Sequence, residues 1–161
     1  MCLVMKGDLK IAEKDIVCYK KVLKLVSNSD KMWRAYYISC ISYPYNRILT
    51  AEKIIDNQRS GEQVTRLEVV EGQYIYEGFH AFTKNIKKET DCILDQYGMK
   101  KICIIPKGAQ YCEGGFDEIV ATHMIVFRDE KQYKRYCVFR PFIRLYNKIT
   151  NKTPNVYGTR R

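Results

Sequence analysis

The fold is decided by two apolar runs in the second half of the chain, Ile102-Cys-Ile-Ile-Pro-Lys-Gly-Ala109 and Ile119-Val-Ala-Thr-His-Met-Ile-Val-Phe127. The second run is apolar on both faces, which is typical of a strand in the centre of a sheet. The first run is shorter, and its Pro106 and Gly108 predict a turn that ends it. Both runs therefore predict strands, at residues 101–105 and 119–127, around which a sheet is built.

Segments with alternating polarity extend this sheet. Residues 15–26 alternate along their length, and the aromatic-rich residues 32–41 follow after the turn-forming Ser-Asn-Ser-Asp at 27–30. This pattern predicts a β-hairpin. Residues 64–71, 73–77 and 110–113 are predicted to be further strands. We expect a sheet that is largely antiparallel or mixed.

Helices are predicted at three places. Residues 83–97 have apolar residues at the helical period, Thr83 can cap the start, and Gly98 can end it. A short helix is predicted at 48–57 with Thr50 as its cap, and another at 129–146 that is broken at Pro141. The predicted fold is a single α+β domain, residues 1–146, with one or two helices packed on the sheet. Residues 147–161 are predicted to form a basic C-terminal tail.

The composition indicates a globular protein of a reducing compartment. Of the 161 residues, 46% are hydrophobic and 29% are charged, which is ordinary for a soluble domain. The seven Cys are odd in number and scattered, without the spacing of a zinc site. The first residues are charged too early for a signal peptide, and no apolar run is long enough to span a membrane. We therefore expect a cytoplasmic protein without a metal site and without a membrane partner.

The last fifth of the chain carries most of the excess positive charge. Residues 128–161 contain ten Lys and Arg against two acidic residues, which leaves +8 of the net +10 there. Such a surface attracts polyanions, although an ordinary solvated face is the simpler alternative. Aromatic residues alternate with these cations, and their rings could stack on bases while the cations meet phosphates. The candidate polyanion-binding residues are Lys134, Arg135, Arg140, Arg144 and Lys148.

Two further segments could carry chemistry. Gly78-Phe-His-Ala-Phe82 is predicted to precede a helix, where backbone N–H groups favour anions and His80 could bind a ligand. The glycine-rich turn at 114–118 places Glu118 ahead of a buried strand. The simpler alternatives are a buried His80 bonded to the backbone and an ordinary solvated turn. His123, among apolar neighbours, is predicted to be a core residue.

Four short motifs resemble small uncharacterised proteins of bacteriophages and gut bacteria, which carry a G-F-H-[AS] element, then I-P-K-G, then a glycine/acid turn. The motifs are Cys18-Tyr-Lys20, Gly78-Phe-His-Ala-Phe82, Ile105-Pro-Lys-Gly-Ala109 and Glu118-Ile-Val120. The resemblance covers scattered pieces of the chain. It implies an accessory protein of a phage or mobile element, in the cytoplasm of the bacterial host cell, and it implies no known activity.

The chain is also similar, more faintly, to the ADP-ribosyltransferase fold. That resemblance implies catalytic roles for Glu118, His80 and Tyr19, with NAD as the cofactor. Two positions depart from the family's pattern: Lys20 stands where Arg or His is usual, and His-Ala-Phe at 80–82 stands where Ser-Thr-Ser is usual. The candidate ligand-binding residues are Lys20, Phe79, Phe82 and Lys107.

Three functions stay open from the sequence. The first is an accessory protein that binds a host protein or an anionic ligand, without catalytic machinery and without a cofactor. The second is an enzyme that transfers ADP-ribose from NAD. The third is a nucleic-acid-binding protein that uses the basic C-terminal third of the chain.

Overall fold

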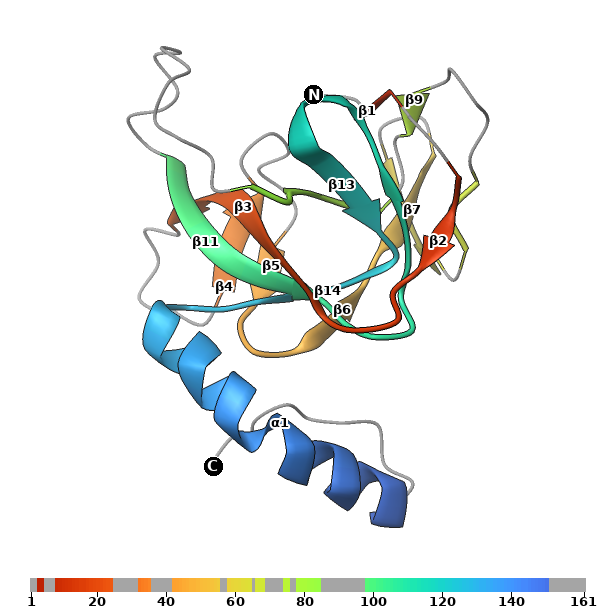
Figure 1. Cartoon of the computed structure of the whole chain (residues 1–161). Coiled ribbons are helices and arrows are strands. Elements are labelled where there is room, and N and C mark those ends of the chain that lie inside the picture. Colours follow the sequence, from red (N-terminus) through yellow and green to blue (C-terminus); the bar gives the residue numbers. More distant parts are fainter. Residues whose placement is uncertain are drawn as a thin grey trace.

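The computed structural model consists of a curved antiparallel sheet with one long helix beneath it (Figure 1). It describes residues 3–4, 8–24, 32–35, 42–55, 58–64, 66–68, 74–75, 78–84 and 98–150, and in the helix it describes side chains only as far as Pro141. Within these residues the predicted α+β class is confirmed, with a sheet that is antiparallel throughout.

The main sheet contains ten strands. Eight of them follow the order β2 (Lys10–Ile11), β12 (Gln110–Glu113), β13 (Glu118–Ala121), β10 (Phe79–Phe82), β3 (Ile16–Lys24), β11 (Gly98–Ile105), β14 (His123–Val126) and β6 (Ile48–Thr50). The other two, β4 (Met32–Ala35) and β5 (Ser42–Pro44), continue from the end of β3. The pairing of β3 with β4 confirms the predicted hairpin, and residues 25–31 lie outside the described part.

Two small sheets and one short helix complete the described elements. β1 (Leu3–Val4) pairs with β9 (Tyr74–Ile75), and β7 (Glu52–Ile55) pairs with β8 (Gln58–Gln63). A 3-10 turn, η2 (Gly115–Asp117), leads into β13. Of the predicted strand at 73–77, residues 74–75 are described and form β9, and the predicted strand at 110–113 is observed as β12.

The main core lies on the inner face of the curved sheet. Side chains alternate along β3, so that Cys18 and Val22 are fully buried while Val17 is 39% exposed. On β11, Cys103 and Ile105 lie opposite β3 and close the same core. The predicted strand at 101–105 is confirmed, and it begins earlier, at Gly98.

The helix α1 (Glu130–Thr150) covers the outer face of β11 and β14. Ile104, Ile125 and Phe127 point to this side and form a second core with Tyr136. Phe127 lies 5.3 Å from the ring of Tyr136 and 5.6 Å from that of Tyr133, between ring centroids. No helix among the described residues is long and apolar enough to cross a bilayer.

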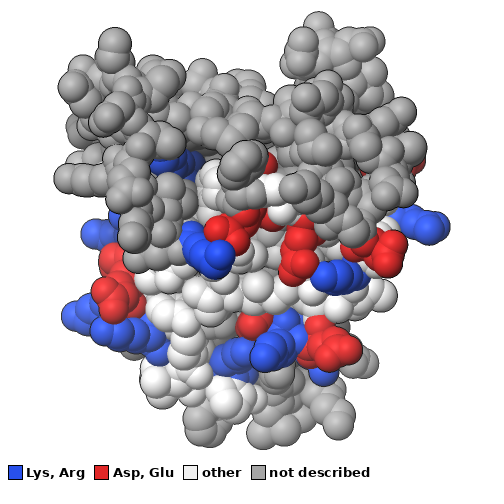
Figure 2. Space-filling view, turned by 45° about the horizontal axis from the view of Figure 1, so that its top comes forward, with Lys and Arg blue, Asp and Glu red and all other residues white. Residues whose placement is uncertain are grey.

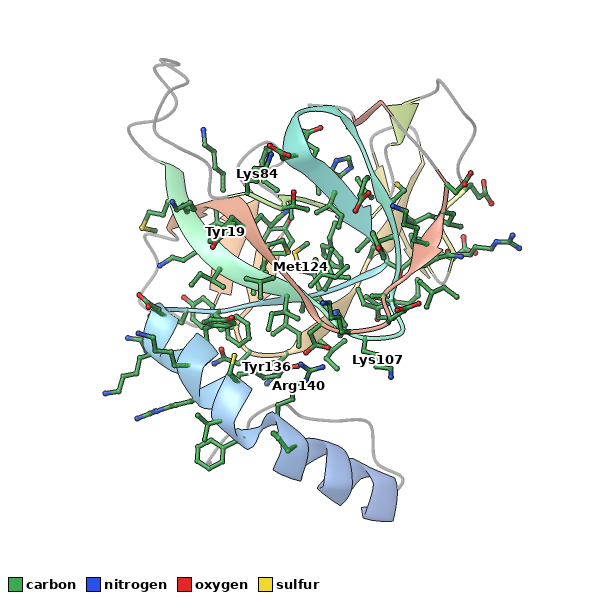
Figure 3. The ribbon with its side chains drawn as sticks, in the orientation of Figure 1. Tyr19, Lys84, Lys107, Met124, Tyr136 and Arg140 are labelled. Atoms are coloured by element: carbon green, nitrogen blue, oxygen red, sulfur yellow. The ribbon has the colours of Figure 1, made fainter. Side chains whose placement is uncertain are left out.

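A buried carboxylate fastens α1 to the sheet. Asp15, whose side chain is 6% exposed, accepts hydrogen bonds from the Tyr136 hydroxyl (3.0 Å) and from the backbone N–H of Lys107 (2.8 Å), and it pairs with Arg140 at 2.6 Å. Figure 3 shows Tyr136 and Arg140 projecting from α1 toward the sheet. Three separate segments thus meet at one side chain, which we call the Asp15 clamp.

The apolar run at 119–127 does not form the single strand that its sequence predicts. It forms β13 and β14, which are separated by Thr122. Thr122 is buried, its N–H donates to the carbonyl of Gln110, and its own carbonyl accepts from Ala51. The chain therefore changes neighbours at this residue: β13 pairs with β10 and β12, and β14 pairs with β11 and β6.

Two predictions for residues 48–71 were wrong. The predicted helix at 48–57 is replaced by β6 and β7, and Thr50 is the register partner of His123 rather than a helix cap. The pairing of β6 with β14, which is distant in the sequence, outweighs the weak local preference for a helix. Of the predicted strand at 64–71, residues 64 and 66–68 are described, and they do not form a strand. The backbone N–H of Leu67 donates to the side chain of Gln110 and not to the backbone of a neighbouring strand.

The predicted interruption at Pro141 is also wrong, since α1 continues through it to Thr150. Proline leaves the carbonyl of residue 137 without its helical donor. Both Cys137 and Pro141 are exposed, so water can satisfy that carbonyl. The helix therefore crosses the predicted boundary between domain and tail at 146, and residues 151–161 lie outside the described part.

Candidate functional site

The Gly78–Phe82 motif lies on a central strand of the sheet, β10. Phe79 and Ala81 are buried while His80 and Phe82 are half-buried, which is the period of two that a strand requires. Gly78 has a φ of +97°, which glycine adopts without strain. Thr83 donates through both its N–H and its hydroxyl to the carbonyl of Asp117, and residues 85–97 of the predicted helix lie outside the described part.

The three predicted catalytic residues share one face of the sheet. Phe82 is the register partner of both Tyr19 on β3 and Glu118 on β13. Tyr19 and Glu118 are therefore two strand spacings apart, which is about 10 Å between backbones. His80 lies on the same face two residues before Phe82, as a diagonal neighbour of Glu118 at about 7–8 Å. We call these four residues the β10 row.

The electrostatics of the β10 row are those of buried groups. Burial raises the pKa of Glu118, whose residue is only 8% exposed. Burial, and secondly the charge of Lys20, lower the pKa of His80 to about 3. The Nδ1 atom of His80 is buried and has no hydrogen-bond partner among the described residues. His80 is therefore neutral near pH 7, and it cannot act there as the imidazolium that an anion site requires.

Lys20 lies on the inner side of the sheet, with 9% exposure. Its Nζ donates to the carbonyl of His80 and lies 5.0 Å from the centroid of the Tyr43 ring. β10 and β3 share one register pair, Phe82 with Tyr19, so the carbonyl of His80 lies beyond the paired part of the ladder. The Lys20 ammonium takes the place of the missing backbone donor.

The other candidate ligand-binding residues are spread over the fold. Phe79 packs edge-on against Tyr43 in the core, with ring centroids 6.0 Å apart, whereas Phe82 belongs to the β10 row. Lys107 is exposed in the turn after β11, beside the Asp15 clamp. Figure 3 shows Lys107 near the lower end of the sheet and Tyr19 on the opposite side of the view. The structure does not bring Lys107 to the β10 row.

The exposed face of α1 holds the second candidate site. A groove of about 490 Å³ lies on it, and its described lining residues are Glu130, Lys131, Lys134, Arg135, Val138 and Phe139. Their spacing of three and four residues places them on one side of the helix. Val138 is 64% exposed and Phe139 is 51% exposed. We call this site the α1 groove.

The cations of the helix divide between two faces. Arg140 belongs to the Asp15 clamp and points toward the sheet (Figure 3). Lys134 pairs with Glu130 at 2.8 Å on the exposed face, which raises the pKa of Lys134. Lys131 and Arg135 have no ion pair with the described residues. The side chains of Arg144 and Lys148 lie outside the described part.

The aromatic residues of α1 divide in the same way. Tyr133 and Tyr136 pack against Phe127 beneath the sheet, so Phe139 is the aromatic ring that the described part of α1 presents outward. The helical period groups residues 131, 134, 135, 138 and 139 on one side of the helix, but it does not tell which side of the helix faces the sheet. On the face shown in Figure 2, by contrast, basic and acidic side chains alternate.

His123 and two core cysteines are the other buried or half-buried groups that could carry chemistry. His123 Nδ1 lies 2.9 Å from the hydroxyl of Thr122, and burial lowers its pKa, which agrees with the predicted structural role. Cys18 and Cys103 are fully buried with their Sγ atoms 3.2 Å apart, and both are free thiols. Within the described ranges, no group of three or more potential ligands could hold a metal ion.

Comparison with known proteins gives no assignment. No protein-family model matches the chain, and neither the curated proteins nor the solved structures contain a match. The function must therefore be argued from the two candidate sites.

Proposed function

We propose that this chain is a binding protein of the phage accessory type, and that it receives an anionic macromolecular partner on the α1 groove. The proposal rests on one observation: positive charges lie beside exposed apolar side chains in the groove. Lys131 and Arg135 project from the groove without an ion pair to the described residues, beside exposed Val138 and Phe139. An exposed apolar patch rimmed by polar residues, here mostly basic ones, is typical of an interaction surface.

The attachment of α1 supports this role. The Asp15 clamp and the rings packed on Phe127 hold the inner face of the helix, so its outer face is presented on a rigid support. The helix has six cations and one acid between residues 130 and 150, a net charge of +5. A cationic surface of this kind increases the rate at which an anionic partner is encountered, and the effect weakens with salt.

The test is binding of fluorescein-labelled heparin, measured by anisotropy over a range of salt concentrations. We expect salt-dependent binding that is lost in the double variant Lys131→Glu/Arg135→Glu. The matched control is Arg66→Glu, which changes an exposed cation beside β12, four strands away from β11. Absence of heparin binding, or equal loss in the control and in the double variant, would refute the proposal.

A second candidate function is the transfer of ADP-ribose from NAD. It is favoured by the shared face of Tyr19, His80 and Glu118 and by the raised pKa of Glu118. On this proposal, NAD raises the melting temperature of the protein, and Glu118→Gln removes that shift. If NAD leaves the melting temperature of the parent protein unchanged, this candidate is excluded.

A further inference from the structure

The α1 groove differs from a purely cationic surface in one respect: its floor is apolar. Val138 and Phe139 expose 64% and 51% of their surface there, whereas the other described aromatic rings of α1 are packed against the sheet. Phosphates and sulfates gain nothing from an exposed ring. A partner that matches this groove must therefore carry negative charges and flat apolar surfaces on one flexible chain.

We propose that the partner is a single-stranded nucleic acid, with one base stacked on Phe139 and its phosphates beside Lys131, Lys134 and Arg135. This inference rests on the proposed function, because it names the ligand of the same groove. In single strands the bases are free to stack on aromatic side chains, and the contact is tolerant of sequence. In a duplex, the base faces are stacked on each other and unavailable to Phe139.

The geometry of the helix suits this arrangement. Lys131, Arg135 and Phe139 follow one another at intervals of four residues, about 6 Å along the axis. The cations therefore lie on one side of the ring, in a line that a flexible backbone can follow. Glu130 lies at the rim and pairs with Lys134, but both side chains are about two-thirds exposed, so a phosphate can compete for Lys134.

Other partners fit the groove less well. A membrane surface would need a longer apolar stripe than the two residues that α1 exposes within its described side chains. An acidic peptide would supply the charge, but its carboxylates bring no flat ring for Phe139. We therefore treat acidic peptide as an outcome of the test.

The experiment compares four probes by fluorescence anisotropy at matched salt: labelled dT15, a duplex of equal charge, heparin and polyglutamate. We expect dT15 to bind tightest. Phe139→Ala should weaken dT15 binding by about 5-fold to 150-fold, the range that corresponds to the loss of one stacked base, and should leave heparin binding unchanged. Phe139→Leu should lose nearly as much as Phe139→Ala, because leucine keeps apolar volume but cannot stack.

Controls separate this inference from the proposed function. Ile11→Ala removes an apolar side chain on β2 that is 65% exposed, more than Phe139, and should not change binding of any probe. Lys131→Gln/Arg135→Gln, which removes the two charges without reversing them, should lower the salt slope of dT15 binding by about 1.4, since each phosphate contact contributes about 0.7 on single strands. If heparin binds but duplex or polyglutamate binds as well as dT15, or if Phe139→Leu binds like the parent, this inference is overturned and the proposed function stands. If none of the probes binds, both are overturned.

Discussion

Asp15→Ala tests whether one carboxylate holds α1 in place. The substitution removes the acceptor for the Tyr136 hydroxyl, the Lys107 N–H and Arg140 together. Breaking a buried ion pair from one side costs about 3–5 kcal/mol. Arg140 is 26% exposed and can turn partly to water, so we expect the lower end, a loss of about 3 kcal/mol in the free energy of unfolding.

Variants that remove fewer contacts show how much each one contributes to stability. Tyr136→Phe deletes one hydrogen bond and should cost about 1–2 kcal/mol, because its acceptor is charged. Asp15→Asn keeps an oxygen acceptor but loses the charge, so its cost should fall between those of Tyr136→Phe and Asp15→Ala. The matched control is Glu113→Ala, which breaks an exposed 2.8 Å pair with Lys10 and should cost less than about 1 kcal/mol.

The assay is urea unfolding followed by circular dichroism, together with thermal melting. For a chain of this size, a loss of 3 kcal/mol corresponds to a fall of about 6–12 °C in melting temperature. If Asp15→Ala is no more destabilising than Glu113→Ala, the clamp does not hold the helix. The support argued for the α1 groove would then be lost as well.

Three further predictions concern buried groups and backbone. Exposed Cys137 should react with iodoacetamide in the native state, whereas Cys18 and Cys103 should be labelled only in urea. Both of the latter are buried, and burial raises the pKa of the Cys103 thiol. Equal labelling of the three cysteines in the native state, measured by peptide mass spectrometry, would contradict this prediction. The lowered pKa of His80 means that the unfolded state takes up a proton between pH 6.5 and 3 while the folded state does not. Stability should therefore fall by about 1.4 kcal/mol for each pH unit below 6.5, and His80→Gln should remove that share of the pH dependence in urea titrations. Gly78→Ala should lower the free energy of unfolding by more than about 2 kcal/mol in the same assay. The added Cβ would lie 2.6 Å from a side-chain carbon of β13, and residue 78 has a positive φ that alanine adopts only with strain. A cost below about 1 kcal/mol would show that β13 can move aside.

Local patterns in the sequence predict the elements but not their neighbours. Alternation along β3 and the short apolar run of β11 were sufficient to predict these strands, and their pairing with eight register partners follows the expected antiparallel sheet. The predicted helix at 48–57 failed because β6 gains its structure from β14, far along the chain. The sequence predicts that the His80 motif precedes a helix, because Gly78 and Thr83 are common at turns and caps, but no local pattern places residues 79–82 in a strand between β13 and β3.

The candidate site could likewise be predicted only in part from local sequence patterns. The sequence identifies the basic segment and its polyanion-binding candidates, but it cannot assign a cation to one face of α1. Arg140 faces the sheet because its partner, Asp15, lies at the start of β3; Tyr136, which bonds the same carboxylate, is 121 positions from it in the sequence. Arg135 lies on the other side of α1 and therefore faces outward when Arg140 faces the sheet. Such a division depends on how the helix docks, and no local pattern encodes it.

The second core has a consequence for synthesis of the chain. Ile104, Ile125 and Phe127 are covered by Tyr136, so the sheet can be translated in full while this apolar surface still lacks its cover. The contacts that close it also join α1 to Asp15, which is translated 121 residues before Tyr136. This surface stays uncovered until α1 has been translated, and a chain that stops at Phe127 would present a surface prone to aggregation.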